Sequence, residues 1–250
     1  MELTIIHSPL ILIFITSLLA LISSIAGDTS TLECDYCHPD DYNTLLKIKA
    51  GLNHPYIIIN WEENGNCKDW CCISCDPKTH RVSTLDIGND VIKPAARIPD
   101  AVGDLPDLDS LTLRKLVNLH GPIPRSIAKL KKLTFLSLDY NNLTGPVPGF
   151  LSQLPNLNYL RLSHNQLTGE IPASLSKLPT PLYVDLSHNQ LTQIAPGFAE
   201  GLDFGTLSLE RNKLAGDASM LFRRKNVWTS IIDISRNSLE FDFSNVSISK

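Results

Sequence analysis

The sequence predicts an α/β solenoid, a right-handed curved superhelix of stacked repeats with a parallel concave β-sheet and a disulfide-rich N-terminal cap. Three observations predict this fold. From residue 80 onward, Leu and Asn recur together at a near-constant interval. All cysteines lie between Cys34 and Cys75, and an apolar run opens the chain. Because a single repeat cannot bury its own apolar face, such repeats must stack and need a cap at the end of the stack.

The first 26 residues have the features of a secretion signal. An apolar run extends from Leu10 to Ile25, and Ser24-Ile25-Ala26 fits the pattern at which signal peptides are cleaved. A membrane anchor is the alternative, but the run is short for a bilayer span, which needs roughly 20 residues. We therefore expect residues 1–26 to be removed from a secreted protein with no further membrane segment. The net charge of −4 excludes a general nucleic-acid binder.

The cysteine-rich segment, residues 27–79, is expected to form the N-terminal cap. An even number of clustered cysteines behind a signal peptide predicts disulfides, although it does not choose among the pairings. The C-x-x-C spacings would also suit zinc, but secretion favours disulfides, so we expect no metal and no cofactor. The cysteines expected to form disulfides are Cys34, Cys37, Cys67, Cys71, Cys72 and Cys75.

The cap is expected to contain one helix and two covering tryptophans. Asp40 and Asp41 can cap the helix. Its apolar residues recur at helical spacing, at Leu45, Leu46, Ile48 and Leu52. Trp61 and Trp70 add apolar surface over the open side of the first repeat.

Residues 80–250 contain about seven copies of the pattern L-x-L-x-x-N-x-L-x-G-x-I-P. Its first apolar position falls at Leu85, Leu111, Leu136, Leu160, Val184, Leu207 and Ile232. Steps of 23 to 26 residues are typical of leucine-rich repeats. The L-x-L alternation predicts a short strand with one buried face. The recurring amide is expected to hydrogen-bond backbone groups where the chain leaves the strand, at Asn141, Asn165, Asn189, Asn212 and Asn237.

Residues between and beside the two leucines are expected to point to the concave face. Six strand intervals of about 4.8 Å give a sheet roughly 29 Å wide, which suits a protein partner. Tyr and Arg often dominate such contacts. Four residues, Phe135, Tyr140, Tyr159 and Tyr183, are expected to form one aromatic strip. The expected partner-binding residues are Arg114, Lys115, Phe135, Asp139, Tyr140, Tyr159, Arg161, His164, Tyr183, Asp185, His188, Glu210 and Arg211.

Two of these residues, His164 and His188, occupy the same slot in adjacent repeats. Repetition of one sequence unit explains them more simply than a metal site does. Imidazole becomes charged in mildly acidic surroundings. We therefore expect acidic pH to strengthen binding to an acidic partner.

Two N-glycosylation sequons are present, at Asn142-Leu143-Thr144 and at Asn245-Val246-Ser247. A secreted chain would meet the glycosylation machinery, so Asn142 and Asn245 are the expected glycan sites.

Several segments resemble one plant family. They are residues 37–41, residues 69–76, and residues 216–219, which depart from G-x-I-P as that family does in a late repeat. On these motifs, over about residues 33–248, the sequence resembles the plant polygalacturonase-inhibiting proteins. The resemblance implies a secreted plant defence protein of the cell wall. Such a protein binds and inhibits pectin-degrading endo-polygalacturonases of microbes or insects through its concave face, and its basic residues can also touch pectin.

The chain departs from this family in three ways. Where the family usually has a pair of cysteines, this chain has Cys67-Lys68. Several final repeats and the family's C-terminal cysteine cap have no counterpart here, so the chain is expected to be C-terminally short. Cys34 and Cys71 are additional to the family's cysteines and could pair with each other.

Three other classes of function compete with this one. No H-E-x-x-H, G-x-S-x-G or P-loop pattern is present, so no enzyme is expected. An antifreeze protein of the same family shares most of these motifs, but ice binding needs a regular array of similar short side chains, and the concave rows are irregular. A soluble, receptor-like ligand-binding protein is the third alternative.

Overall fold

A computed structural model describes residues 36–63, 65–179, 182–198, 204–222 and 231–241. These residues belong to one compact unit, which spans Glu33–Lys250. The expected signal peptide, Cys34 and Asn245 lie outside the described residues. Within the described part of the chain, no helix is both long enough and apolar enough to cross a bilayer.

The N-terminal cap is built on one α-helix. Its elements are α2 (Pro39–Gly51), the 3-10 helices η1 (Tyr56–Ile58) and η2 (Cys67–Asp69), and strand β1 (Ile73–Cys75). A disulfide joins Cys37, just before α2, to Cys67 in η2. The rings of Trp61 and Trp70 are buried and stack with centroids 5.5 Å apart. The two tryptophans belong to the same buried apolar cluster as Val82 and Leu85 of the first repeat, as expected.

Asp40 and Asp41 were expected to cap the helix, but His38 does so instead. His38 precedes the helix, and its Nδ1 accepts a hydrogen bond from the Asp40 amide at 3.3 Å. Asp41 is fully buried instead, and its Oδ2 accepts a hydrogen bond from the Val82 amide at 2.8 Å. Its Oδ1 lies 2.9 Å from Nη2 of Arg81. Asp41 therefore ties the cap helix to the first repeat strand.

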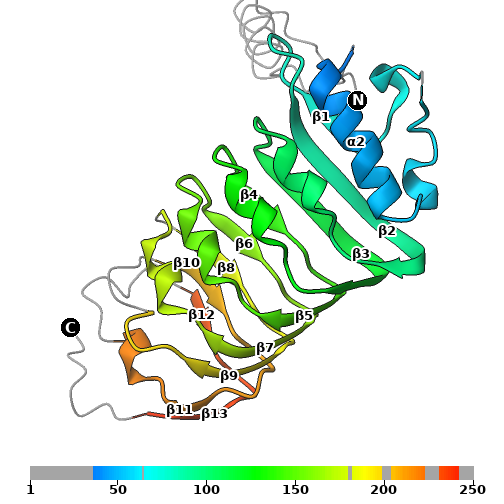
Figure 1. Ribbon diagram of the computed structural model, residues 1–250. Helices are drawn as coiled ribbons and strands as arrows, with labels where there is room; N and C mark the ends of the chain where they lie inside the picture. The colour runs from blue at the N-terminus through cyan, green and yellow to red at the C-terminus, as the bar shows by residue number, and fades with distance from the viewer. Residues whose placement is uncertain (1–35, 64, 180–181, 199–203, 223–230, 242–250) are drawn as a thin grey trace, which may run out of the picture. The chain divides into compact units, whose positions relative to one another are not determined.

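A curved parallel sheet runs along the repeats (Figure 1). Its strands pair in chain order: β2 (Val82–Ala96), β3 (Ser110–Gly121), β4 (Phe135–Ser137), β6 (Tyr159–Arg161), β8 (Leu182–Asp185), β10 (Phe204–Ser208) and β12 (Ile231–Asp233). Strand β1 pairs antiparallel with β2. The first apolar position of each repeat is a register partner of the next, from Leu85 and Leu111 through to Leu207 and Ile232. The predicted leucine-rich-repeat solenoid is confirmed.

A second set of strands follows the asparagine of each repeat. It comprises β5 (Asn142–Pro146), β7 (Gln166–Ile171), β9 (Gln190–Ile194), β11 (Ala215–Asp217) and β13 (Ser238–Glu240). The end of β3 pairs with β5, and β5, β7 and β9 pair in turn, while β11 pairs with β13. The sequence pattern did not predict these strands, because G-x-I-P was interpreted only as a turn.

Short 3-10 helices carry the chain back toward the next strand. They are η3 (Asp100–Asp104), η4 (Arg125–Lys129), η5 (Gly149–Gln153), η6 (Ala173–Lys177) and η7 (Ser219–Phe222). The proline of G-x-I-P is the residue before η4, η5 and η6. Its fixed φ and missing amide hydrogen suit that position, where a helix begins and the pairing of the preceding strand ends.

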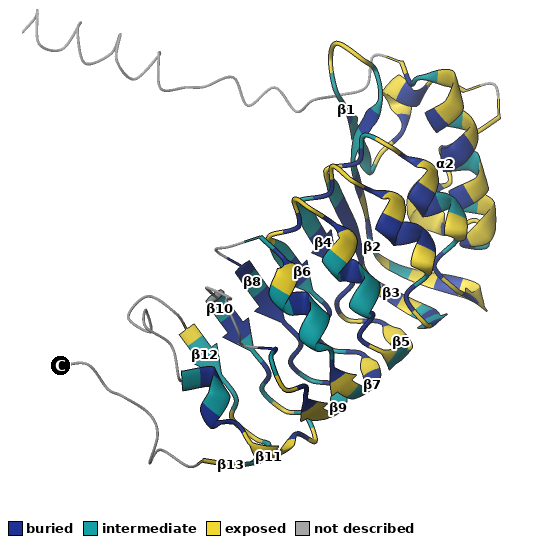
Figure 2. Cartoon of the chain, turned by 60° about the vertical axis from the view of Figure 1, so that its left-hand side comes forward, coloured by how far each residue is buried: buried dark blue, intermediate teal, exposed yellow. Residues whose placement is uncertain are grey.

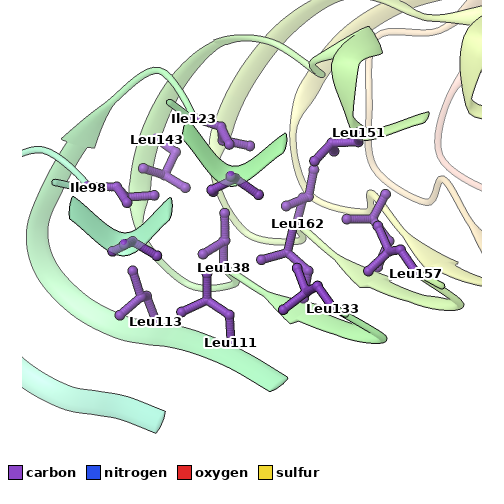
Figure 3. Packing of buried hydrophobic residues seen from close by; sticks show 14 of the residues in the cluster. Ile98, Leu111, Leu113, Ile123, Leu133, Leu138, Leu143, Leu151, Leu157 and Leu162 are labelled. Carbon is purple, nitrogen blue, oxygen red and sulfur yellow. The ribbon is translucent and has the colours of Figure 1, made fainter. Parts of the chain in front are cut away.

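One apolar core runs through all the described repeats. Each repeat contributes leucines or isoleucines from the concave strand, the second strand and the 3-10 helix, and nearly all are fully buried. Figure 3 shows Leu113, Leu138 and Leu162, which hold the same position in three successive repeats, following one another through this core. Repeats stabilise one another in this way because each covers the apolar side of its neighbour.

The recurring asparagines form the expected ladder. The Asn189 side chain accepts a hydrogen bond from the Leu167 amide at 3.0 Å and donates to the carbonyls of Leu162 and Leu186 at 3.0 Å each. Equivalent bonds are made by Asn141, Asn165, Asn212 and Asn237. These amides satisfy backbone groups that would otherwise be buried without a partner.

The expectation that all the cysteines form disulfides is only partly confirmed. Cys75 is disulfide-bonded in addition to the Cys37–Cys67 pair. Cys71 and Cys72, however, are free thiols. The Sγ of Cys71 donates to the Ile57 carbonyl at 2.8 Å and faces the Sγ of its own neighbour, Cys72. The expected disulfide role of these two residues, and the pairing of Cys71 with Cys34, is therefore wrong.

Candidate interaction surface

Each concave strand offers four outward positions, but they differ in exposure. The first and the last are half-buried or exposed in most repeats, whereas the inner two are buried or half-buried in the repeats of β4, β6 and β8. These three strands have the colours of buried and intermediate residues in Figure 2. Curvature crowds the inner positions of neighbouring strands against one another. The accessible surface is therefore two parallel columns of side chains with a largely buried polar row between them.

The first position forms a column that we call the tyrosine column: Phe135, Tyr159 and Tyr183. Ring centroids are 4.3 Å apart between Phe135 and Tyr159 and 4.2 Å apart between Tyr159 and Tyr183, with nearly parallel planes. The three side chains are half-buried. Burial, followed by the neighbouring Tyr159, raises the pKa of Tyr183. Because the faces cover one another, the column presents ring edges and the two tyrosine hydroxyl groups.

The last position forms a second column, the histidine column: Lys115, Tyr140, His164 and His188. The ammonium of Lys115 lies 5.5 Å from the Tyr140 centroid, and the ring centroids that follow are 4.0 and 3.9 Å apart. Tyr140 is thus separate from the tyrosine column, and the expected single aromatic strip is wrong. All four residues have φ between +50° and +57°. This left-handed turn directs their side chains along the rim of the sheet.

The stacked histidines differ from isolated imidazoles. Burial, and then the nearby charge of His188, lower the pKa of His164. The rings lie face to face, so their nitrogens do not converge on one point. No group of three or more His, Cys, Asp or Glu side chains arranged for a metal occurs within the described ranges. The lowered pKa opposes the protonation on which the expected acid-enhanced binding depends.

A charge cluster lies between the two columns. Nε of Arg161 is 3.4 Å from Oδ2 of Asp185 and 3.8 Å from Oδ2 of Asp139. Burial by itself would lower the pKa of Arg161, but the two carboxylates outweigh burial and raise it. Ser137 donates a hydrogen bond to Asp139, and Ser187 donates one to Asp185 at 2.6 Å.

This cluster changes the expected role of the two aspartates. Asp139 is 2% exposed and Asp185 is 7% exposed, so neither carboxylate can reach a partner directly. They hold Arg161, a third of whose side chain remains accessible, in the middle of the concave face. Asp139 and Asp185 therefore position Arg161, whose side chain is the accessible part of the cluster.

The remaining expected residues lie at the two ends of the face. Arg114 and Lys115 are exposed near the N-terminal end, on β3. At the other end, Glu210 is half-buried and lies 3.3 Å from Nε of Arg211 and 3.6 Å from Nη1 of Arg236. Arg236 was not among the expected site residues, although its slot in the repeat matches that of Arg211 and could have identified it.

Family models match two parts of the chain. A leucine rich repeat model matches residues 131–191, and a leucine rich repeat N-terminal domain model matches residues 38–76. The chain is also 54% identical to polygalacturonase inhibitor 2 of Arabidopsis thaliana, over 89% of this chain and 74% of that protein. The chain belongs to the polygalacturonase-inhibitor family. A polygalacturonase inhibitor of Vitis vinifera is 52% identical over 86% of this chain and 71% of its own length.

A solved structure of a plant ice-binding protein also has this fold. It is 37% identical to the chain, with a TM-score of 0.65, over 84% of this chain and 75% of that one. The polygalacturonase-inhibitor family thus shares its solenoid with a protein of different reported binding. Polygalacturonase inhibitors are extracellular. The fold by itself therefore does not specify what a protein of this kind binds.

Proposed function

We propose that this protein binds endo-polygalacturonases through its concave face and so blocks the hydrolysis of pectin. The observation that carries the proposal is the identity of 52–54% to proteins named polygalacturonase inhibitors across most of the chain. The protein acts by binding and not as an enzyme. Its targets are enzymes of microbes or insects, and its site of action is the plant cell wall.

The concave face supports the proposal by its chemistry. The tyrosine column and the histidine column offer rigid ring edges that lose little conformational entropy when they are covered. Arg161 contributes a guanidinium between the columns, and Arg114 and Lys115 add exposed positive charge. Rigid aromatic groups around Arg are the side chains that most often dominate protein interfaces. The same cations can contact the uronate groups of pectin.

The direct test measures pectin hydrolysis. The secreted protein is added to a panel of fungal, bacterial and insect endo-polygalacturonases, and the reducing ends released from polygalacturonate are counted. The proposal requires dose-dependent inhibition of at least one enzyme. Replacement of both Tyr159 and Tyr183 by Ala should weaken inhibition by about tenfold or more. The matched control is Tyr56→Ala, because Tyr56 is 78% exposed but lies on the cap. Inhibition of no enzyme by the folded protein would overturn the proposal.

A second candidate is ice binding, and the second sheet favours it. Thr144, Thr168 and Thr192 are exposed on β5, β7 and β9, one in each strand. The register places Thr144 beside Gln166 and Thr168 beside Gln190. Uncharged polar side chains therefore recur on the exposed side of this sheet, whereas the concave rows mix charged and aromatic residues.

Ice binding has its own measurement. Thermal hysteresis and the growth of ice grains are compared for the protein and for a variant with Thr168→Lys on the central strand. Loss of an ice effect in the variant, with inhibition of polygalacturonase unchanged, would assign ice binding to the second sheet. No ice effect in the unsubstituted protein would eliminate this candidate.

Glycosylation of Asn142 is a further part of the proposal. Asn142 is exposed at the start of β5, and Thr144 lies on the same side of that strand. A glycan at this position would stand on the second sheet and leave the concave face open. Mass spectrometry of the protein secreted from plant cells, before and after enzymatic deglycosylation, tests the assignment.

A further inference from the structure

Two adjacent free thiols occur in the cap, outside the concave columns. Cys71 and Cys72 lie between η2 and β1, and their Sγ atoms are 3.0 Å apart. A disulfide bond is about 2.05 Å long, so a movement of roughly 1 Å would bring the two sulfurs to bonding distance. The two thiols can therefore be oxidised together to one disulfide within the chain, a reaction that a single cysteine cannot undergo.

The two sulfurs have different surroundings. Cys71 is exposed, and its Sγ donates to the Ile57 carbonyl at 2.8 Å. Cys72 is half-buried, and its Sγ donates to the Sγ of Cys71. Burial, followed by the hydrogen bond to Cys71, raises the pKa of Cys72 to about 12. Cys71 is thus the accessible thiol, and Cys72 is a protonated thiol held directly behind it.

The backbone around the pair is held in place. The indole Nε1 of Trp61 donates to the Cys71 carbonyl at 3.0 Å, and the Asp86 amide donates to the Cys72 carbonyl at 2.8 Å. Cys72 has a φ of +70°, a left-handed conformation that is uncommon for a residue with a side chain. These contacts keep the two thiols beside each other.

We propose that Cys71 and Cys72 form a thiol–disulfide exchange site whose substrates are low-molecular-weight disulfides such as oxidised glutathione. The Cys71 thiolate attacks one sulfur of the disulfide RSSR, a mixed disulfide forms, and the first RSH leaves with a proton. Cys72 then loses its proton and attacks the Cys71 sulfur, and the second RSH leaves. Two thiols of the protein are oxidised to one disulfide, and RSSR is reduced to two RSH.

The product disulfide should be easy to reduce. Adjacent Cα atoms are about 3.8 Å apart, which is shorter than the roughly 4.4–6.8 Å of ordinary disulfides. Closing the ring therefore strains the chain, and strained, exposed disulfides are the labile ones. Both residues of the Cys37–Cys67 disulfide are buried, so a mild reductant should open the adjacent pair first.

The test uses the full-length protein, its Cys72→Ser and Cys71→Ser variants, and oxidised glutathione. Peptide mass mapping and thiol titration follow the products. The starting protein should lose two thiols and retain no glutathione, while Cys72→Ser should retain one glutathione on Cys71. Cys71→Ser should react at Cys72 at least about tenfold more slowly, because the remaining thiol is half-buried and has a raised pKa. Circular dichroism and an intact Cys37–Cys67 bond verify that each variant is folded.

Three outcomes would overturn the proposal. The first is a stable glutathione adduct on the unsubstituted protein, since Cys72 would then not complete the exchange. The second is reaction of Cys71→Ser as fast as that of Cys72→Ser, since the order of attack would then be wrong. The third is oxidation that yields disulfide-linked dimers in place of the adjacent bond.

Discussion

Nε of Arg161 lies 3.4 Å from Oδ2 of Asp185, the residue directly beside it on the neighbouring strand. With Asp139 on its other side, this guanidinium joins three consecutive repeats across the middle of the concave face. The pair has two consequences: it stabilises the stack, and it places one cation where a partner can reach it.

Replacing Arg161 by Met should lower the free energy of unfolding by about 1–3 kcal/mol, because two buried carboxylates lose their cation. Urea denaturation followed by circular dichroism measures the change. Lys129→Met is the matched control, since Lys129 makes an exposed ion pair with Asp104 at 2.9 Å. Its loss should cost at most about 1 kcal/mol. Equal losses in the two variants would contradict the structural role of Arg161.

Removing a buried asparagine of the ladder should lower the free energy of unfolding more than removing an exposed asparagine does. Asn189→Ala removes the partner of one amide and three carbonyls in the core, so stability should fall by about 2–4 kcal/mol. Asn156→Ala removes one exposed hydrogen bond, which Asn156 donates to the Lys131 carbonyl at 2.8 Å. That loss should be about 0.5–1.5 kcal/mol. Thermal unfolding of both variants measures the two losses. Equal losses would show that the ladder does not stabilise the fold more than an exposed hydrogen bond does.

The lowered pKa of His164 predicts a loss of stability in acid. Its pKa in the unfolded chain is about 6.5, so below that value the unfolded state binds more protons than the folded state. Stability should therefore fall as the pH drops from about 6.5 toward the lower pKa of the folded state. His164→Asn should reduce this fall, because Asn tolerates positive φ and carries no titrating group.

His54→Asn is the control for this pH dependence. His54 also has positive φ, at +54°, but it is exposed on the cap. Unfolding free energies are compared at pH 5 and pH 7 for all three proteins. A fall of the same size in His164→Asn and in the unsubstituted protein would show that another group causes the pH dependence.

Stacking in the tyrosine column predicts which atoms a partner touches. If ring edges and hydroxyls make the contact, Tyr159→Phe should weaken inhibition by about 2–10-fold, which corresponds to one hydrogen bond. Tyr56→Phe, on the exposed part of the cap, should leave inhibition unchanged. Inhibition constants against the most sensitive polygalacturonase provide the measurement. No difference between the two variants would mean that the Tyr159 hydroxyl is not at the interface.

Much of the fold could be predicted because one pattern is repeated. The apolar positions from Leu85 to Ile232 were predicted as equivalent, and the register of the strands confirms it. The ladder role of Asn189 and its equivalents followed from the need to satisfy buried backbone groups. The second sheet was not predicted, since the short segments after each asparagine alternate too briefly to distinguish a strand from a turn.

The site could be predicted only as a set of outward positions. Sequence placed Tyr140 with Tyr159, but the left-handed turn at Tyr140 assigns it to the column of His164. Asp139 was expected on the surface, whereas a neighbouring arginine allows it to be buried. Cysteine spacing likewise suggested a disulfide at Cys71, but bonding depends on which sulfurs meet in space.

The local pattern of residues therefore specifies the repeat, whether each strand side chain points inward or outward, and the position of each ladder asparagine. These properties follow from a period of two residues along each strand and of about 24 residues along the solenoid. Both periods can be read from the amino-acid sequence. Exposure, ring stacking, the ion pairs of Arg161 and the free thiols depend on distances between different repeats. Those distances arise from the packing and curvature of the whole stack, and a linear pattern does not contain them.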